Sequence, residues 1–138
     1  MAQLSEDVIA AIEDPQSVKM LATADKQKSI NMVPIGSIKV VDEETLAYAC
    51  FFAGKTKRNI ETTRQAAIVI FQPPLEGYQV KGRFLKWETA GDIYDQVTIP
   101  VVEQLKSMGL SLTPQAVGII KVTEAYALSL PIAGEKIA

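Results

Sequence analysis

Histidine is absent from this sequence of 138 residues, and cysteine occurs only once. The absence of histidine excludes a Ser-His-Asp triad, a histidine general base, a zinc site with histidine ligands and a histidine-ligated haem. A single cysteine, Cys50, cannot form a disulfide within the chain, which suits a reducing compartment such as the cytoplasm. Because Cys50 lies in an apolar run, we expect a small buried side chain and not a reactive thiol.

Long apolar runs are also missing. No segment reaches the roughly 18 consecutive apolar residues that indicate a membrane-spanning helix. The first residues include Glu6 and Asp7, where a signal peptide would carry basic residues. A net charge of -2 and a pI near 5.2 argue against general nucleic-acid binding, which requires a basic face. We therefore expect a soluble cytoplasmic protein that binds neither membranes nor nucleic acid.

The length and the apolar fraction of 48% are those of one globular domain spanning residues 1–138. The predicted helices span 4–13, 56–64 and 92–108, and the predicted strands span 17–24, 30–41, 45–52, 66–72, 77–89 and 116–130. Six strands joined mostly by short turns predict a mainly β fold, a small closed or half-closed antiparallel barrel. The glycine fingerprint of a Rossmann nucleotide site is absent.

Cations mark the start of the second predicted helix. Lys55, Lys57 and Arg58 follow Gly54 directly after the apolar run 46–52. Because the amides of a first helical turn carry partial positive charge, cations there lose about 0.3–1 kcal/mol each. An anion bound between the amides and the cations removes this cost. The segment therefore predicts either a phosphate site or a solvated charged turn.

Pro34 and Gly36 interrupt the predicted strand 30–41. Proline cannot donate to a strand ladder, so it indicates an edge strand or a bulge. Glycine indicates a place where another group approaches the backbone closely. Residues 33–36 are therefore either part of a binding site or a bulge that bends a barrel strand.

Together these features resemble the FMN-binding split-barrel family, over roughly residues 18–130. The family includes pyridoxamine 5'-phosphate oxidases, flavoredoxin-like proteins and very small FMN-binding electron-transfer proteins. The resemblance implies a six-stranded antiparallel split β-barrel that forms a homodimer. The features that carry it, in chain order, are Pro34 and Gly36, then Lys55-Thr56 at a helix start, Asn59 one turn later, and Lys81-Gly82-Arg83 on a later strand.

The resemblance implies one FMN per subunit at the dimer interface. The second strand would face the flavin ring, the turn after the third strand would border it, and the following helix would bind the phosphate. The implied residues are Met32, Val33, Pro34, Ile35, Gly36 and Ser37 at the ring, Phe51, Phe52, Ala53 and Gly54 beside it, and Lys55, Thr56 and Asn59 at the phosphate, with Lys57 or Arg58 as a second cation. The strand 81–83 and the C-terminal tail would lie near the partner's cofactor.

The implied function is that of an FMN-dependent redox protein, a flavin reductase or an electron carrier, with a small-molecule or protein redox partner. One alternative is an enzyme of the pyridoxamine 5'-phosphate oxidase type, which needs a second phosphate site; Lys81, Arg83 and Lys86 are its only clustered candidates. Another is a non-catalytic module that binds a flavin, a deazaflavin or another phosphorylated ligand. Haem-handling relatives generally use a histidine ligand, which this chain lacks. Trp87 either lies near the partner's flavin or belongs to the interface core.

Overall fold

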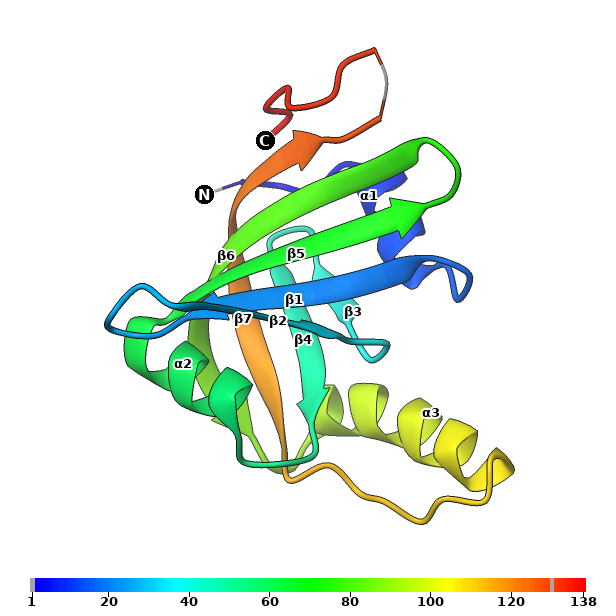
Figure 1. Cartoon of the computed structure of the whole chain (residues 1–138). Helices are drawn as coiled ribbons and strands as arrows, with labels where there is room; N and C mark the ends of the chain where they lie inside the picture. Colours follow the sequence, from blue (N-terminus) through cyan, green and yellow to red (C-terminus); the bar gives the residue numbers. More distant parts are fainter. Residues whose placement is uncertain (1, 130) are drawn as a thin grey trace.

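The described chain folds into one antiparallel sheet that curls into a barrel, with helices packed against it (Figure 1). The computed structural model describes residues 2–129 and 131–138. Its elements in chain order are α1 (Glu6–Glu13), β1 (Val18–Ala24), β2 (Ile30–Pro34), β3 (Lys39–Asp42), β4 (Thr45–Cys50), α2 (Lys55–Thr63), β5 (Gln65–Gln72), β6 (Glu76–Glu88), α3 (Asp92–Ser107) and β7 (Ala116–Ala127). The strand order in the sheet is β2-β1-β5-β6-β7-β4-β3.

The two edge strands, β2 and β3, are consecutive in the sequence, and residues 35–38 cross between them. The mainly β, antiparallel split barrel is confirmed, but its sheet has seven strands within residues 2–129 and 131–138 instead of the predicted six. The prediction of one strand over 30–41 is wrong, because pairing with β1 ends just after Pro34, where the Ile35 N–H donates to the Lys19 carbonyl (2.9 Å). The interpretation of Pro34 as an edge-strand residue is confirmed.

Along each strand, side chains point alternately into the barrel and out of it. The outer side is covered by α3 in one region and exposes apolar side chains in another. Leu21, Ile68, Val80 and Ile120 point inward and are each at most 1% exposed. On the outside of β4 and β7, α3 buries a second apolar cluster that includes Val117. The outer side of β2, β1 and β5 instead keeps large apolar side chains exposed, which are Val18, Ile30, Met32 and Phe71.

A buried lysine holds α1 on the barrel. The helix begins after Ser5, whose Oγ accepts a hydrogen bond from the Val8 N–H (3.4 Å). At its other end, Lys19 Nζ donates to the carbonyls of Ile12 (3.1 Å) and Asp14 (3.2 Å). Burial lowers the pKa of Lys19, and the nearby acidic side chains oppose this. The lysine therefore satisfies carbonyls at the end of the helix from the first strand of the sheet.

The other predicted boundaries differ little from the observed ones. Of the two outcomes predicted at Pro100, a kink or a second segment, the second segment is not found in the described chain, because α3 runs through Pro100 as one helix. The last predicted strand stops early, at Ala127, and its predicted end at Leu130 lies outside the described residues. After it, the tail folds back so that the Ala127 N–H donates to the Glu135 carbonyl (2.8 Å). No helix in the described ranges is long and apolar enough to span a membrane.

Candidate functional site

Helix α2 is attached to the β1–β2 hairpin by one buried apolar side chain and by polar contacts. Ile60 is fully buried and faces the barrel core. The polar contacts run from Asn31 Nδ2 to Thr56 Oγ1 (3.1 Å), from Asn59 Nδ2 to Thr23 Oγ1 (3.2 Å) and from Thr63 Oγ1 to the Ala24 carbonyl (2.9 Å). These contacts fix the rotation of the helix about its axis, so its remaining side chains point in set directions.

The first turn of α2 has no side-chain cap among the described residues. Gly54 precedes the helix in an extended conformation. The first amides of an uncapped helix have no intrahelical partner and carry partial positive charge. This arrangement suits an anion, provided that nearby side chains contribute to the same site.

The cations of the segment 55–58 separate onto two sides of α2. Lys57 Nζ bonds to Glu61 Oε2 (3.0 Å), and the same oxygen accepts from Trp87 Nε1 (2.9 Å). These two hydrogen bonds lower the pKa of Glu61. The indole of Trp87 also packs against Phe84 of its own chain (4.8 Å between ring centroids). Lys57 and Glu61 therefore attach α2 to β6.

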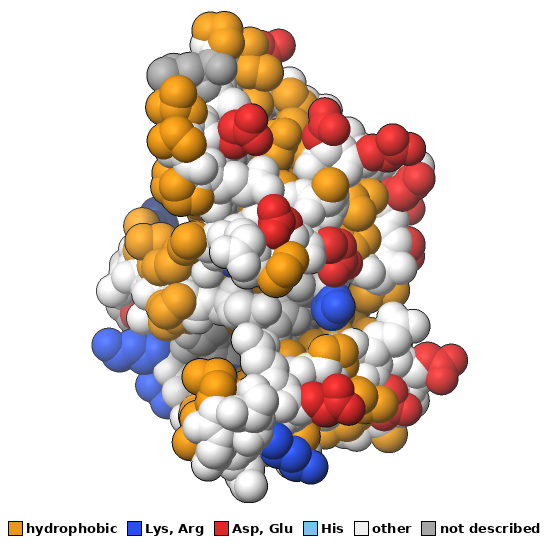
Figure 2. Space-filling view, turned by 90° about the vertical axis from the view of Figure 1, so that its right-hand side faces the viewer, with side chains coloured by type: hydrophobic (Ala, Val, Ile, Leu, Met, Phe, Trp, Pro, Cys, Tyr) orange, Lys and Arg blue, Asp and Glu red, His pale blue; other side chains and the backbone are white. Residues whose placement is uncertain are grey.

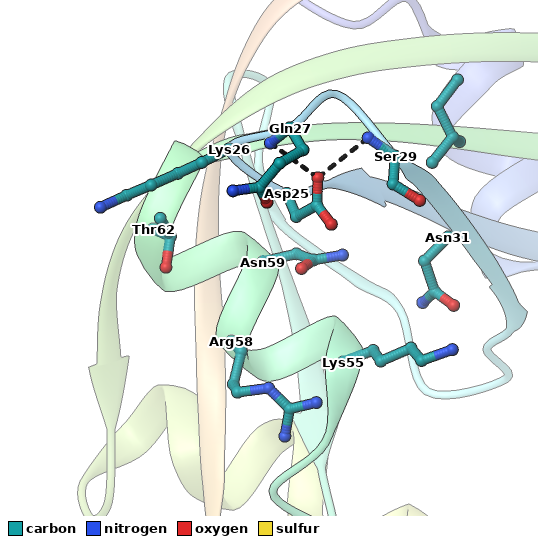
Figure 3. A pocket seen from close by; sticks show the side chains of 10 residues that line it. Asp25, Lys26, Gln27, Ser29, Asn31, Lys55, Arg58, Asn59 and Thr62 are labelled. Carbon is teal, nitrogen blue, oxygen red and sulfur yellow. Dashed lines mark hydrogen bonds between the residues drawn. The ribbon is translucent and has the colours of Figure 1, made fainter.

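Lys55 and Arg58 instead border a hollow between α2 and the β1–β2 turn (Figure 3), which we call the α2 hollow. Its volume is about 440 Å³. The residues that line it are Asp25, Lys26, Gln27, Ser29, Ile30, Asn31, Lys55, Arg58, Asn59 and Thr62. In Figure 3, Asn59 and Lys55 extend from the helix toward the strand that carries Asn31, whereas Lys26 points away.

The α2 hollow is positively charged although the whole chain is acidic. Asp25 is its only carboxylate, and Asp25 Oδ1 accepts from the N–H groups of Gln27 and Ser29 (2.9 Å each). Within the described chain, Lys55 and Arg58 make no ion pair. Figure 2 shows acidic side chains gathered over the upper part of the face opposite to α2. This separation of charge favours an anionic ligand at the hollow.

The structure brings together most of the residues predicted to bind phosphate. Lys55 and Asn59 both line the α2 hollow, and Thr56 lies beside it through its bond to Asn31. Of the two candidates for a second cation, Arg58 lines the hollow and Lys57 does not.

The residues predicted to face the flavin ring lie outside the α2 hollow. Met32, Pro34 and Gly36 are exposed, Val33 and Ile35 pack against the core, and Ser37 Oγ accepts from the Ala49 N–H (3.0 Å). Phe51 packs against the α3 cluster, whereas Phe52 is 70% exposed and Ala53 is also exposed. The close approach expected at Gly36 is not seen in the described part of the chain, because a Cβ there would meet nothing within 4 Å.

Sequence reasoning missed Asn31 and the turn 25–29, which form one wall of the hollow. Asn31 did carry a signal, because asparagine is depleted in strands and here interrupts an apolar one. The turn carried none, since polar residues are usual in any turn.

The candidates for a second phosphate site do not line one hollow. Lys86 pairs with Glu88 (3.0 Å), and Lys81 lies 5.5 Å from the ring of Tyr126. Lys81 lines a separate hollow of about 460 Å³ that neither Arg83 nor Lys86 borders.

Cys50 is 7% exposed. Its thiol donates to the Phe52 carbonyl (3.6 Å), and burial raises its pKa. The expectation of a buried cysteine is confirmed, and a thiol in this state is a poor nucleophile.

Comparison with models of known protein families assigns the chain to one family. The family model described as pyridoxamine 5'-phosphate oxidase matches residues 5–128. The chain belongs to this family. Comparison with curated proteins gives no match.

Solved structures of family-like proteins share the fold. HupZ of Group A Streptococcus is 25% identical with a TM-score of 0.77, over 98% of this chain and 99% of that one. An FMN-binding protein from Syntrophomonas wolfei is 17% identical with a TM-score of 0.78, over 91% and 86%. HutZ, a heme storage protein from Vibrio cholerae, is 15% identical with a TM-score of 0.65, over 91% and 94%. Proteins described by different ligands thus share this barrel.

Proposed function

We propose that this protein binds FMN and acts as a redox protein, a flavin reductase or an electron carrier. The observation that carries the proposal is the α2 hollow, where Lys55 and Asn59 meet the uncapped first turn of α2. Thr56 joins the same helix to β2 through Asn31. The family match and the similarity to an FMN-binding protein support a flavin as the ligand.

The phosphate of FMN would be held at the start of α2. A phosphate dianion accepts hydrogen bonds from backbone amides and from the Lys55 ammonium, and charge-assisted bonds contribute about 1.5–3 kcal/mol each. Asn59 is already bonded to Thr23 through Nδ2, so its carboxamide is fixed in orientation. These groups bind and orient the cofactor, and the redox chemistry is that of the flavin.

The ring would lie along the free edge of β2. In the described sheet this strand pairs with β1 on one side only, so its second row of backbone N–H and C=O groups is unpaired. Such an edge can form hydrogen bonds with the pyrimidine part of a flavin without any particular side chain. No acid–base catalyst is required for hydride or electron transfer.

We also propose that the protein is a homodimer in the cytoplasm. The outer side of β2, β1 and β5 exposes Val18, Ile30 and Met32 at 49%, 78% and 60%. Burial of these side chains against a second copy would remove contiguous apolar surface from water. The free thiol of Cys50 suits the reducing conditions of the cytoplasm.

The proposal is tested by the absorption spectrum of the purified protein and by identification of any released cofactor. We expect flavin bands, or uptake of added FMN by colourless protein. Lys55→Ala and Thr56→Ala should each weaken FMN binding about 10-fold, since each removes one polar contact. Lys106→Ala, which removes a cation from α3, is the control and should leave the affinity unchanged. Protein that stays colourless with added FMN would refute the flavin assignment, and unchanged affinity in both variants would refute the phosphate site.

Two alternatives have distinct outcomes. An oxidase of the pyridoxamine phosphate type would turn over pyridoxamine or pyridoxine phosphate faster than free FMN does. This alternative is not favoured, because Lys81 lines a hollow that neither Arg83 nor Lys86 borders, and Lys86 pairs with Glu88. A non-catalytic flavin or deazaflavin module would bind its ligand tightly without faster reduction by NADH or NADPH.

A further inference from the structure

The α2 hollow has cations at one end. Lys55 and Arg58 line it from the first turn of α2, where the phosphate of the proposed cofactor would be held. The residues proposed to face the flavin ring do not line the hollow. A group attached to the phosphate on the side away from the ring must therefore continue into the hollow or leave it for solvent.

The other end of the hollow carries a carboxylate. Thr63 Oγ1, at the end of α2, donates to the Ala24 carbonyl (2.9 Å), so the turn 25–29 lies beside the last turn of the helix. Thr63 follows Lys55 by about 12 Å at the rise of an α-helix. Asp25 lines the hollow from this turn, and Figure 3 shows Asp25 and Lys55 at opposite ends.

No cation of the described chain pairs with the Asp25 carboxylate. Lys26 lies next to it in the sequence but points away from the hollow (Figure 3). The N–H groups of Gln27 and Ser29 donate to Asp25 Oδ1 (2.9 Å each) and fix the carboxylate in place. A second negative charge beyond the phosphate would therefore meet a fixed like charge, and like charges repel.

We propose that Asp25 determines which phosphate esters the α2 hollow accepts. It admits a terminal phosphate monoester and disfavours a phosphate that carries a further anionic group, so the cofactor class is FMN and not the diphosphate FAD. Neither Phe, Tyr nor Trp is among the described lining residues, so stacking of a base does not offset the repulsion. This inference rests on the proposed flavin function and adds to it a residue that selects by charge.

Fluorescence titration of the purified protein with FMN and with FAD tests this selection. Wild-type protein should bind FMN more tightly than FAD. Asp25→Asn keeps a side-chain oxygen that can accept from the turn amides but removes the charge. It should tighten FAD relative to FMN by about 5-fold, the effect of one like charge about 4 Å away in water. This gain should shrink at high salt, because salt screens the repulsion.

Asp42→Asn is the matched control. Asp42 Oδ1 accepts from the Glu44 N–H (2.9 Å) in the turn between β3 and β4, which does not line the hollow. The variant removes an equal charge from a similar turn and should keep the wild-type ratio of FMN to FAD affinity. FAD binding as tight as FMN in the wild type, or an unchanged ratio in Asp25→Asn, would overturn the proposal.

A second measurement does not depend on the flavin ring. Orthophosphate and inorganic pyrophosphate should each raise the thermal unfolding midpoint, and Asp25→Asn should increase the pyrophosphate effect more than the orthophosphate effect. An equal change for both anions would contradict selection by Asp25. Failure of the protein to bind either flavin, with this difference between the anions present, would instead refute the proposed flavin function and leave the role of Asp25 standing.

Discussion

Gly82 and Gly36 lie in opposite surroundings, which gives a prediction about stability. A Cβ on Gly82 would lie 2.5 Å from Ile120 Cγ2 and 2.7 Å from the Lys121 carbonyl oxygen, whereas a Cβ on Gly36 would meet nothing within 4 Å. Because the carbonyl belongs to the neighbouring strand β7, the strands must shift to admit a methyl group. We expect Gly82→Ala to lower the free energy of unfolding by about 1–3 kcal/mol.

Gly36→Ala is the matched control, and its change should stay within about 0.5 kcal/mol. Urea denaturation followed by the fluorescence of the single tryptophan measures both variants. Equal stability of the two variants would contradict the close packing at Gly82.

At the residue scale, the sequence shows that cations lie at the start of α2, but it does not show toward which neighbours their side chains point. The pattern of 55–59 predicted a phosphate site, yet Lys57 and Arg58 could not be told apart. The burial of Ile60 sets the rotation of α2, which places Arg58 at the hollow and Lys57 beside Trp87. This choice depends on tertiary packing, so local sequence does not encode it. No protein atom of the described chain lies within 4 Å of a Cβ placed on Gly36, so a close approach by a bound group at this residue stays a prediction.

The contact between α2 and β6 should depend on pH. The hydrogen bonds from Lys57 and Trp87 lower the pKa of Glu61 below its ordinary 4.5. The ionised Glu61 carboxylate therefore stabilises the folded state above about pH 4.5. This stabilisation is lost as the pH falls through the lower pKa that Glu61 has in the folded state. Since the Glu61 side chain is 41% exposed, solvent screening limits it to about 1 kcal/mol.

Glu61→Gln is the variant that tests this dependence. Wild-type protein should exceed it in free energy of unfolding at pH 7 by up to about 1 kcal/mol, and the difference should vanish toward pH 3. Glu103→Gln, on the exposed side of α3, should match the wild type at both pH values. A difference for Glu61→Gln that does not change with pH would contradict the ionic role of Glu61.

At the element scale, helices were predicted better than strands. Ser5 and Gly54 mark helix starts through local chemistry, and both lie directly before a helix. The strand predicted over 30–41 failed because its apolar residues continue past Pro34, whereas its pairing with β1 stops there although β1 itself extends to Val18. Residues before and after the crossing at 35–38 are apolar. Hydrophobic periodicity alone therefore does not show that the chain passes from one edge strand of the sheet, β2, to the other, β3.

At the scale of the whole molecule, the exposed apolar side chains on the outer side of β2, β1 and β5 predict how one introduced charge changes the oligomeric state. Val18 is 49% exposed and pairs in register with Phe71 on β5, which is also exposed. If a second copy covers this face, Val18→Asp buries an unpaired carboxylate and should convert a dimer into a monomer. Analytical ultracentrifugation measures the change.

Ile99→Asp on α3 is the control, because Ile99 is 55% exposed on a different face. It should sediment like the wild type. Identical sedimentation of the wild type and Val18→Asp would contradict an interface through β1 and β5.

The class of fold could be predicted from the sequence because many short strands with turn residues between them permit few architectures. The order of strands in the sheet could not. Strand β7 lies between β6 and β4, and β1 lies between β2 and β5. Such long-range pairing depends on which faces meet across the whole chain, and no local pattern specifies it.

The position of β7 also has a consequence for how the chain acquires its structure during synthesis. Strands β1, β2, β5 and β6 can pair with one another as soon as β6 has left the ribosome, whereas β3 and β4 have only each other until β7 follows. The apolar strand β4 must then wait, without its main partner, while α2, β5, β6 and α3 are made. Contacts between segments so distant in sequence form slowly, and an exposed apolar strand invites aggregation. The nascent chain is therefore most vulnerable before β7 joins its two halves.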